Sequence, residues 1–176
     1  MKKIAVFGSA FNPPSLGHKS VLDSLSHFDL VLLVPSIAHA WGKEMLDFDV
    51  RCQLLEGFIQ DLALPNVEVS LIEKGLHQPG NSVTTYEVLS NIQELHPDAD
   101  ITFVIGPDNF FKFASFYKAE EIMQKWSVMA CPEKLVIRST DIRKALGEGN
   151  KIDQLTTPSV TKILQDSELY TIIRNS

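Results

Sequence analysis

The stretch FGSAFNPPSLGH, residues 7–18, continues from the apolar run IAVF at residues 4–7. A short apolar run that ends at a glycine is typical of a buried strand. Behind it, Gly8 lets the backbone come close to a ligand and Ser9 supplies a hydroxyl. His18 opens a helical pattern, and the free amides of a first helical turn favour anions. The stretch therefore predicts a strand, an anion-binding loop and a helix.

Short apolar runs and helical patterns alternate along the rest of the chain. We expect strands at residues 4–7, 30–34, 67–72, 101–105 and 128–131, and helices at 18–28, 47–62, 84–95, 109–116, 119–126, 140–146 and 159–165. Such alternation forms βαβ units, which give a mainly parallel sheet with helices on both faces. The predicted fold class is thus α/β, with one Rossmann-like, doubly wound sheet over residues 1–176. Ligands of such folds bind beyond the carboxyl ends of the strands, where the strand order reverses.

Composition restricts the class of protein. The 176 residues are 44% hydrophobic, which suits one compact domain, and the net charge of −6 argues against a broad nucleic-acid surface. No run is long enough to cross a bilayer and no signal-peptide pattern is visible, so we expect no membrane association. Cys52 and Cys131 form no C-x-x-C pair, which favours reduced thiols and a cytoplasmic location. A homo-oligomer stays open.

A second stretch, VIRSTDIRKAL at residues 136–146, contains the start of a short helix. Taken alone, Ser139 or Thr140 reads as an N-cap and Arg143 as a solvated arginine. Together with the opening loop the stretch reads differently. Two helix N-termini, a histidine and an arginine can converge on one polyphosphate.

These stretches resemble a known family. GSAFNPPSLGH resembles the G-x-F-N/D-P-x-H/T-x-G-H signature of the nucleotidyltransferases related to class I aminoacyl-tRNA synthetases, and IRSTDIR resembles their I-S-S-T-x-I-R. TYEVL (85–89), FVIGPDNFFKFASFYKAEEI (103–122) and TPSVTKILQDSELY (157–170) are similar to stretches of the bacterial nicotinate-nucleotide adenylyltransferases. The resemblance implies an enzyme of NAD biosynthesis that transfers AMP from ATP to the 5′-phosphate of nicotinate (or nicotinamide) mononucleotide and releases pyrophosphate.

The resemblance also implies a role for each matching residue. The catalytic positions are His18, Arg143 and Ser15. The positions that hold ATP and its phosphates are Gly8, Ser9, Phe11, Gly17, Ser139, Thr140, Gly106 and Asp108. The positions around the second substrate are Lys43, Thr85, Phe116 and Tyr117. Mg²⁺ would arrive with ATP, and we expect no protein metal site because the acidic residues do not fall at metal-ligand spacings.

Three features depart from the family pattern. Ser15 stands where the first histidine of the signature is usual, Arg138 replaces a serine, and the link at residues 132–138 is short. Phosphopantetheine adenylyltransferases carry threonine at the position of Ser15, so we expect the Ser15 hydroxyl to act as a hydrogen-bond donor. Two alternatives stay open: the same transfer to another phosphomonoester such as phosphopantetheine, and a non-catalytic ATP-binding regulatory module.

Overall fold

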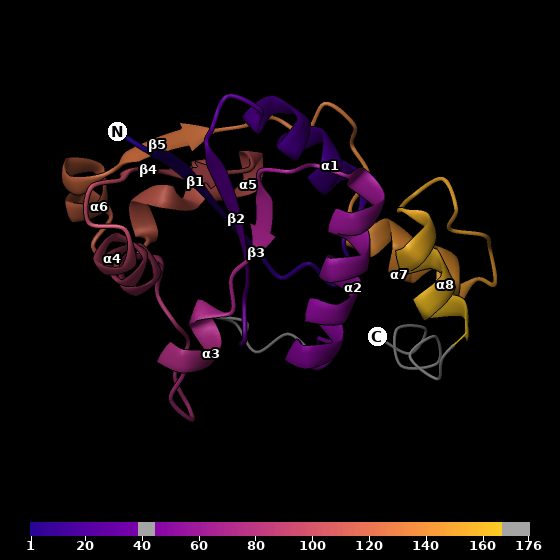
Figure 1. The fold of residues 1–176 in the computed structure, drawn as a ribbon. Coiled ribbons are helices and arrows are strands. Elements are labelled where there is room, and N and C mark those ends of the chain that lie inside the picture. The colour runs from indigo at the N-terminus through magenta and orange to yellow at the C-terminus, as the bar shows by residue number, and fades with distance from the viewer. Residues whose placement is uncertain (39–44, 167–176) are drawn as a thin grey trace.

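The centre of the molecule is a parallel sheet. The computed structural model describes residues 1–38 and 45–166, and its five strands stand in the order β3-β2-β1-β4-β5 (Figure 1). The strands are β1 (Lys3–Ser9), β2 (Leu30–Pro35), β3 (Val67–Val69), β4 (Asp100–Ile105) and β5 (Ser127–Ala130). The strand order reverses between β1 and β4, so the predicted doubly wound, Rossmann-like α/β fold is confirmed.

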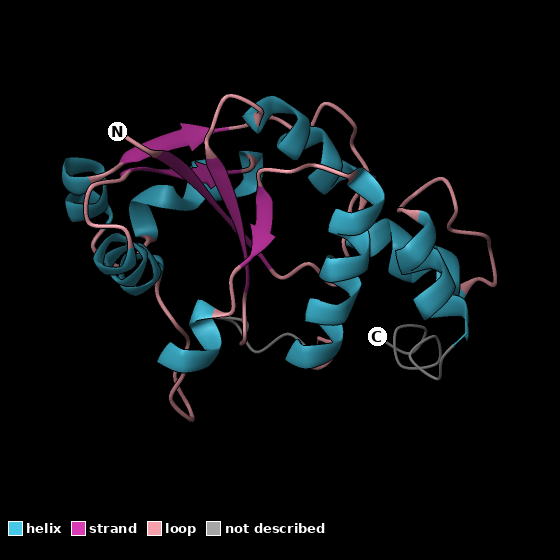
Figure 2. Cartoon of the chain, viewed as in Figure 1, coloured by secondary structure: helices cyan, strands magenta, loops and turns pink. Residues whose placement is uncertain are grey.

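Helices cover both faces of this sheet, as expected from the βαβ pattern (Figure 2). They are α1 (Leu16–Leu22), α2 (Phe48–Leu62), α3 (Ile72–Leu76), α4 (Thr85–Leu95), α5 (Pro107–Lys112), α6 (Ala119–Lys125), α7 (Ser139–Gly147) and α8 (Pro158–Asp166). Short 3₁₀ turns follow α1 and α5 at Asp23–Leu25 and Phe113–Ser115. Across residues 1–38 and 45–166, every helix falls short of the length and apolar character that a membrane span needs.

The two faces of the sheet bury separate apolar cores, because successive residues of a strand point to opposite sides. On one face, Ala5 and Phe7 pack with apolar side chains of α1, α2, α7 and α8. On the other, Ile4 and Val6 pack with apolar side chains of α4 and α6. The central strand β1 is thus buried on both sides, and the loop that leaves its carboxyl end starts from a rigid base.

Local capping explains where two helices begin. Thr84 and Glu87 form the predicted capping box of α4, with the Glu87 amide donating to Thr84 Oγ1 at 3.2 Å and the Thr84 amide donating to Glu87 Oε2 at 2.8 Å. Helix α1 begins at Leu16, before the expected residue 18, because Ser15 caps it. It also ends at Leu22 instead of running to residue 28.

The strand expected at residues 67–72 is shorter than predicted. The Ser70 amide donates the last bond toward β2, to the Leu33 carbonyl at 2.8 Å. The chain then turns, and the Lys74 amide bonds back to the Leu71 carbonyl at 3.0 Å, within the start of α3. Ile72 belongs to this helix and packs against the core on the α4 side, so its apolar character reflects burial rather than strand structure.

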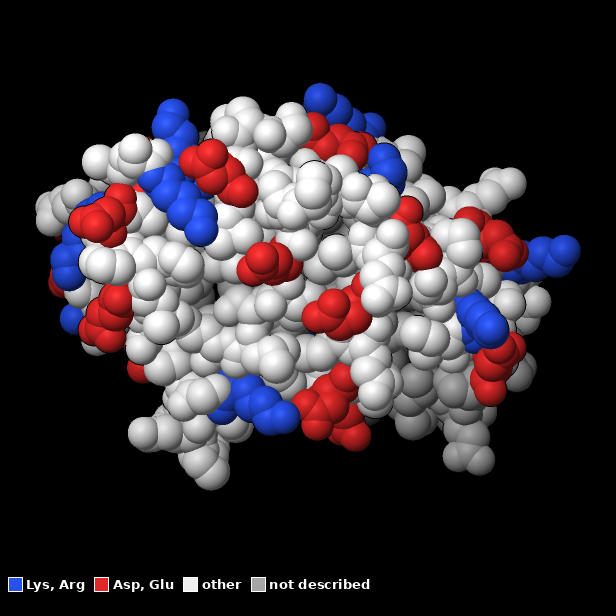
Figure 3. Space-filling model, in the orientation of Figure 1, with Lys and Arg blue, Asp and Glu red and all other residues white. Residues whose placement is uncertain are grey.

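Charges on the surface are mixed. On the face drawn in Figure 3, the lysine and arginine side chains of the described residues are scattered among aspartates and glutamates. This distribution agrees with a chain that carries 16 basic and 22 acidic residues.

Candidate active site

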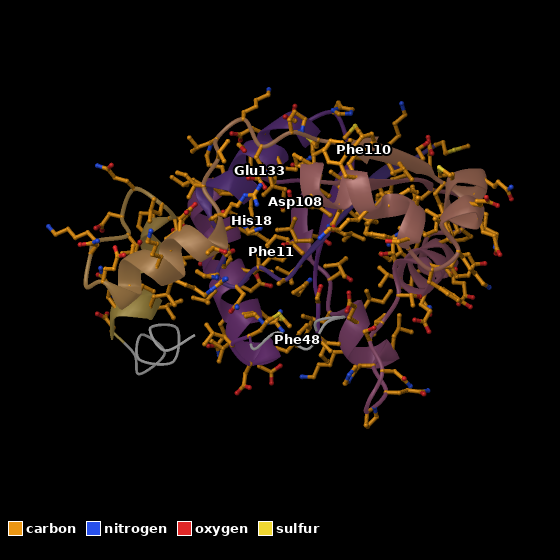
Figure 4. The ribbon with its side chains drawn as sticks, turned by 180° about the vertical axis from the view of Figure 1, so that it is seen from behind. Phe11, His18, Phe48, Asp108, Phe110 and Glu133 are labelled. Atoms are coloured by element: carbon orange, nitrogen blue, oxygen red, sulfur yellow. The ribbon has the colours of Figure 1, made fainter. Side chains whose placement is uncertain are left out.

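The candidate site lies where the strand order reverses. The opening loop leaves the carboxyl end of β1, and Gly106 caps α5 directly after β4, the strand beside β1. Figure 4 labels Phe11 and His18, whose ring centroids are 4.8 Å apart, and Asp108 at the start of α5. Two segments that the sequence analysis singled out separately thus meet at the position where such folds bind ligands.

Side chains from distant parts of the chain hold the opening loop by its carbonyl oxygens. These bonds run from Arg51 Nη1 to Ala10 O (2.8 Å), from Arg143 Nη1 to Asn12 O (2.7 Å), from Ser139 Oγ to Pro13 O (2.6 Å) and from Thr156 Oγ1 to Pro14 O (2.8 Å). The loop is therefore fixed by α2, by α7 and by the segment before α8. A loop held at so many carbonyls needs little reorganisation when a ligand binds.

Phe11 packs against the histidine of the site. Its φ of 48° lies in the left-handed region, which is uncommon for a bulky residue, and its side chain is 1% exposed. The ring centroid lies 4.8 Å from that of His18 and 5.6 Å from that of Phe7. Burial between these rings sustains the unfavourable backbone conformation, and Phe11 in turn limits the movement of the His18 ring.

His18 is hydrogen-bonded through both ring nitrogens. Nδ1 lies 3.0 Å from the Ser15 amide, which donates to it, and Nε2 lies 3.3 Å from Ser9 Oγ. Burial lowers the pKa of His18 from 6.5 to about 4. The imidazole is therefore neutral at physiological pH and acts as a hydrogen-bonding group rather than as a cation.

Ser15 caps α1 from a buried position. Its hydroxyl donates to the Ile137 carbonyl at 2.8 Å and accepts from the His18 amide at 3.4 Å, and the residue is 1% exposed. The hydroxyl that we expected to serve a ligand thus points to the backbone of the 132–138 link. The sequence alone could not predict this contact, because 122 residues separate the two partners.

The start of α7 faces the opening loop. Ser139 and Arg143 both bond to carbonyls of that loop, and Arg143 Nη2 also donates to Thr140 Oγ1 at 3.2 Å. A guanidinium carries five N–H donors, so Arg143 keeps further donors for a ligand. The N-cap is Arg138, one residue before Ser139, so neither Ser139 nor Thr140 serves as the cap.

Arg138, at the start of α7, forms an ion pair with Asp108 in α5, the helix that follows β4. Its Nη1 lies 3.0 Å from Asp108 Oδ2, with the two side chains 50% and 68% exposed. An exposed pair of this kind contributes at most about 1 kcal/mol to stability. It joins α7 to α5 across the edge of the sheet, where a ligand can compete for either partner.

Glycines of the site differ in their surroundings. A Cβ atom on Gly17 would lie 2.1 Å from the Ile137 carbonyl oxygen, so the link passes too close for any side chain. A Cβ atom on Gly8 would make only an ordinary contact of 3.8 Å, and one on Gly106 would meet nothing within 4 Å. Gly17 is thus required by packing, whereas Gly8 and Gly106 leave open backbone that a ligand can approach.

The residues expected around the second substrate are only partly brought together. Thr85 begins α4, and its neighbour Tyr86 contacts the Tyr117 ring edge-on at 6.4 Å. Phe116 instead packs inward, with its ring 5.3 Å from that of Phe113. Lys43 lies outside the described residues.

Two buried charged residues were missed. Arg51 is 1% exposed and donates to the carbonyls of Leu46, Ala10 and Ser36 at 2.8, 2.8 and 2.6 Å. Glu73 is 8% exposed and accepts from the Ile37 amide at 3.2 Å, and burial raises its pKa to about 7. The sequence did carry a signal for the arginine, since residue 51 stands at helical core spacing with the buried Leu54, Leu55 and Phe58.

Two further features of the described residues bear on ligand binding: their acidic and metal-ligating side chains, and a pocket against α1. Within residues 1–38 and 45–166, no group of three or more His, Cys, Asp or Glu side chains is arranged to hold a metal ion. A shallow pocket of about 400 Å³ lies against α1, and none of the predicted site residues lines it. Its lining residues are Leu16, Lys19, Ser20, Asp23, Lys134 and Leu135.

The sheet is doubly wound and parallel, and its opening loop lies at the reversal point, which is where α/β folds of this kind place a ligand site. Comparison with known families specifies the class further. The sequence pattern of the cytidylyltransferase-like family matches residues 6–145, so the chain belongs to that family and is a nucleotidyltransferase.

Individual relatives agree with this assignment. A crystal structure assigned as a nicotinate-nucleotide adenylyltransferase from Vibrio parahaemolyticus is 64% identical, covers 94% of this chain and 99% of its own, and superposes with a TM-score of 0.85. A curated relative of the same designation from Lactiplantibacillus plantarum is 26% identical over 192 residues, which are 96% of this chain and 88% of the relative. The resemblance found in the sequence is thereby confirmed.

A more distant structure shares the fold alone. The Plasmodium falciparum nicotinic acid mononucleotide adenylyltransferase complexed with NaAD is 19% identical, covers 97% of this chain and 98% of its own, and has a TM-score of 0.78.

Proposed function

We propose that this chain transfers AMP from ATP to the 5′-phosphate of nicotinate mononucleotide and releases pyrophosphate, as a step of NAD biosynthesis. The observation that carries the proposal is the opening loop itself, with His18 beside Ser9 at its start and Arg143 bonded to Asn12 in its middle. A neutral N–H donor from α1 and a guanidinium from α7, both held against one loop, suit a polyphosphate. The Vibrio relative, at 64% identity, supports the choice of acceptor.

The proposed reaction needs no catalytic nucleophile. An oxygen of the acceptor phosphate, already ionised at neutral pH, attacks the α-phosphorus of ATP, and the bond to pyrophosphate breaks. Such a transfer depends on alignment and on stabilising charge at the phosphoryl oxygens. His18, Arg143, Thr140 and the backbone at Gly8 supply donors for this purpose, while Ser9 accepts or donates through its hydroxyl.

Asp108 and Gly106 would hold the nucleotide at the start of α5, and Mg²⁺ would enter bound to ATP. The Arg138–Asp108 pair lies in the same place, so ATP binding would loosen it or draw Arg138 onto a phosphate. The magnesium ion would bridge phosphate oxygens and neutralise part of their charge. This assignment asks for no metal site built from protein side chains.

The proposal also assigns residues that bind the acceptor, nicotinate mononucleotide. Thr85 and Tyr117 would lie beside the pyridine ring, Phe116 would support them from the core, and Lys43 would reach the acceptor phosphate. We propose nicotinate rather than nicotinamide as the preferred ring, and action in the cytoplasm on small molecules alone. Whether one chain acts alone or as a homo-oligomer does not enter the chemistry.

Pyrophosphate release with Mg²⁺-ATP and one acceptor at a time tests this function. The acceptors are nicotinate mononucleotide, nicotinamide mononucleotide and phosphopantetheine. Turnover highest with nicotinate mononucleotide supports the proposal. Turnover with phosphopantetheine alone keeps the mechanism and replaces the substrate. ATP binding without turnover on any acceptor identifies a regulatory module instead.

A further inference from the structure

We propose that Ser15 is a positioning residue, whose hydroxyl ties the 132–138 link to the start of α1 and so keeps the Nε2–H of His18 directed at the phosphates. This inference rests on the proposed AMP transfer and deepens it. It gives Ser15 a role different from that of a group which touches substrate.

The Ser15 hydroxyl has one hydrogen, and the lengths of its contacts indicate which acceptor receives it. Oγ lies 2.8 Å from the Ile137 carbonyl and 3.3 Å from His18 Nδ1, so the shorter contact to the carbonyl takes the hydrogen. The lone pairs are left to accept from the His18 amide. With the residue 1% exposed, its hydroxyl is fully occupied inside the protein.

The backbone amide of Ser15, which the capped first turn of α1 holds in place, selects the tautomer of His18. The Ser15 amide carries a hydrogen that points at Nδ1 from 3.0 Å, so a second hydrogen on Nδ1 would collide with it. Nδ1 is therefore an acceptor, and the single hydrogen of the neutral ring is on Nε2. That hydrogen faces Ser9 Oγ at 3.3 Å, at the start of the opening loop, where a bound phosphate would compete for it.

The 132–138 link packs directly against this arrangement. Its Ile137 carbonyl touches both Ser15 and the position of a Cβ on Gly17, so the link lies directly on the first turn of α1. A buried serine fits beneath it. An imidazole at position 15 would need the space that the link occupies. Restoring the usual histidine should therefore displace the link and harm the site instead of improving it.

The test compares four variants of the full chain. Ser15→Ala removes the tether, Ser15→Thr keeps a hydroxyl, and Ser15→His restores the family residue. Ser20→Ala is the matched control, because Ser20 is also buried on α1 and its hydroxyl donates to the Gly17 carbonyl, at 2.7 Å. The readouts are kcat, KM for ATP, the thermal midpoint and the ¹⁵N chemical shifts of the His18 ring.

The proposal predicts a specific pattern. Ser15→Ala lowers kcat by about tenfold, since a small misplacement of a catalytic group is costly, while KM for ATP changes by less than about threefold. Without the hydroxyl's bonds to Ile137 O and to the His18 amide, the first turn of α1 loosens and the Ser15 amide no longer holds Nδ1. The His18 ring of Ser15→Ala therefore shows a mixture of tautomers, whereas wild type and Ser20→Ala show hydrogen on Nε2 alone. Ser15→Thr recovers most of the loss, and Ser15→His is less active than Ser15→Ala.

Other results overturn it. A wild-type kcat in Ser15→Ala, or higher activity in Ser15→His than in wild type, would show that the bond from the Ser15 hydroxyl to Ile137 has no positioning role. Lower kcat in Ser15→Ala with an unchanged ring spectrum reduces Ser15 to a structural cap. If wild type itself turns over no acceptor, the proposed function fails separately, and the ring spectra of wild type and Ser15→Ala still decide whether the tether sets the tautomer.

Discussion

Arg143 Nη1 donates a hydrogen bond of 2.7 Å to the carbonyl oxygen of Asn12, which lies 131 residues earlier in the chain. One guanidinium therefore holds the opening loop, and in the proposed function the same group binds the phosphates. A lysine cannot do both, because its ammonium is a single point of charge.

Arg143→Lys should accordingly lower kcat/KM for ATP by about 100-fold, a loss in the range of one catalytic donor. It should also lower the free energy of unfolding by about 1 kcal/mol through the lost bond to Asn12. Pyrophosphate release and urea denaturation measure the two effects. Lys144→Ala, at an exposed neighbouring position on α7, is the control and should behave as wild type. Activity of Arg143→Lys within about threefold of wild type would refute the double role.

His18→Ala should lower kcat by at least about 100-fold, because it removes an N–H donor that we propose stabilises the phosphoryl oxygens. Since the imidazole is neutral, lowering the pH from 8 to 6.5 should leave its contribution unchanged. Steady-state kinetics at several pH values measures both. His27→Ala is the control, as His27 is exposed and its ring packs against that of Phe28, 4.4 Å away between centroids. A His18→Ala enzyme that keeps a third of its activity would exclude His18 from the chemistry.

Arg51→Met should lower the free energy of unfolding by about 3 kcal/mol, because three loop carbonyls lose a buried donor together. Denaturant unfolding followed by circular dichroism measures the change. Lys74→Met is the control, since Lys74 pairs with Asp49 at 3.0 Å on the surface and should contribute less than about 1 kcal/mol. Equal effects of the two substitutions would contradict the view that Arg51 organises the loops.

Glu73 makes stability depend on pH in a direction opposite to most carboxylates. Its pKa rises from 4.5 to about 7 on folding, so the folded state holds the proton more tightly and loses stability as pH increases through that interval. Glu73→Gln removes this loss. Relative to wild type, the free energy of unfolding of the variant should therefore increase by on the order of 2 kcal/mol between pH 5 and pH 8.

Unfolding free energies of both proteins across pH 5 to 8 provide the test. His18 has the reverse slope, because its pKa falls from 6.5 to about 4 on folding, and the difference between variant and wild type cancels it. A difference that does not vary with pH would show that Glu73 is ionised throughout.

Local sequence patterns predicted the features that depend on residues close together in the chain. Thr84 and Glu87 are three residues apart, and their capping box formed as expected. The alternation of Ile4, Ala5, Val6 and Phe7 between two cores likewise follows from strand geometry. The resemblance to a known family then added the roles of the loop residues, which no periodicity could supply.

Contacts between segments that are distant in the sequence could not be predicted from local patterns. Nothing near Ser15 in the sequence indicates that its hydroxyl meets Ile137, and nothing near Ala10 points to Arg51. These partners depend on how the link and α2 pack against the opening loop. The end of β3 was misjudged for a related reason, since Ile72 is apolar in order to pack from a helix.

The most direct test of the central claim follows the α-phosphate. ATP labelled with radioactive phosphorus at that position is incubated with Mg²⁺, nicotinate mononucleotide and the enzyme, and the products are separated by chromatography. The account predicts that the label moves into the dinucleotide, that the released pyrophosphate is unlabelled, and that His18→Ala nearly abolishes the transfer. Label that stays in ATP, or that appears as free AMP with no dinucleotide, would contradict AMP transfer to nicotinate mononucleotide.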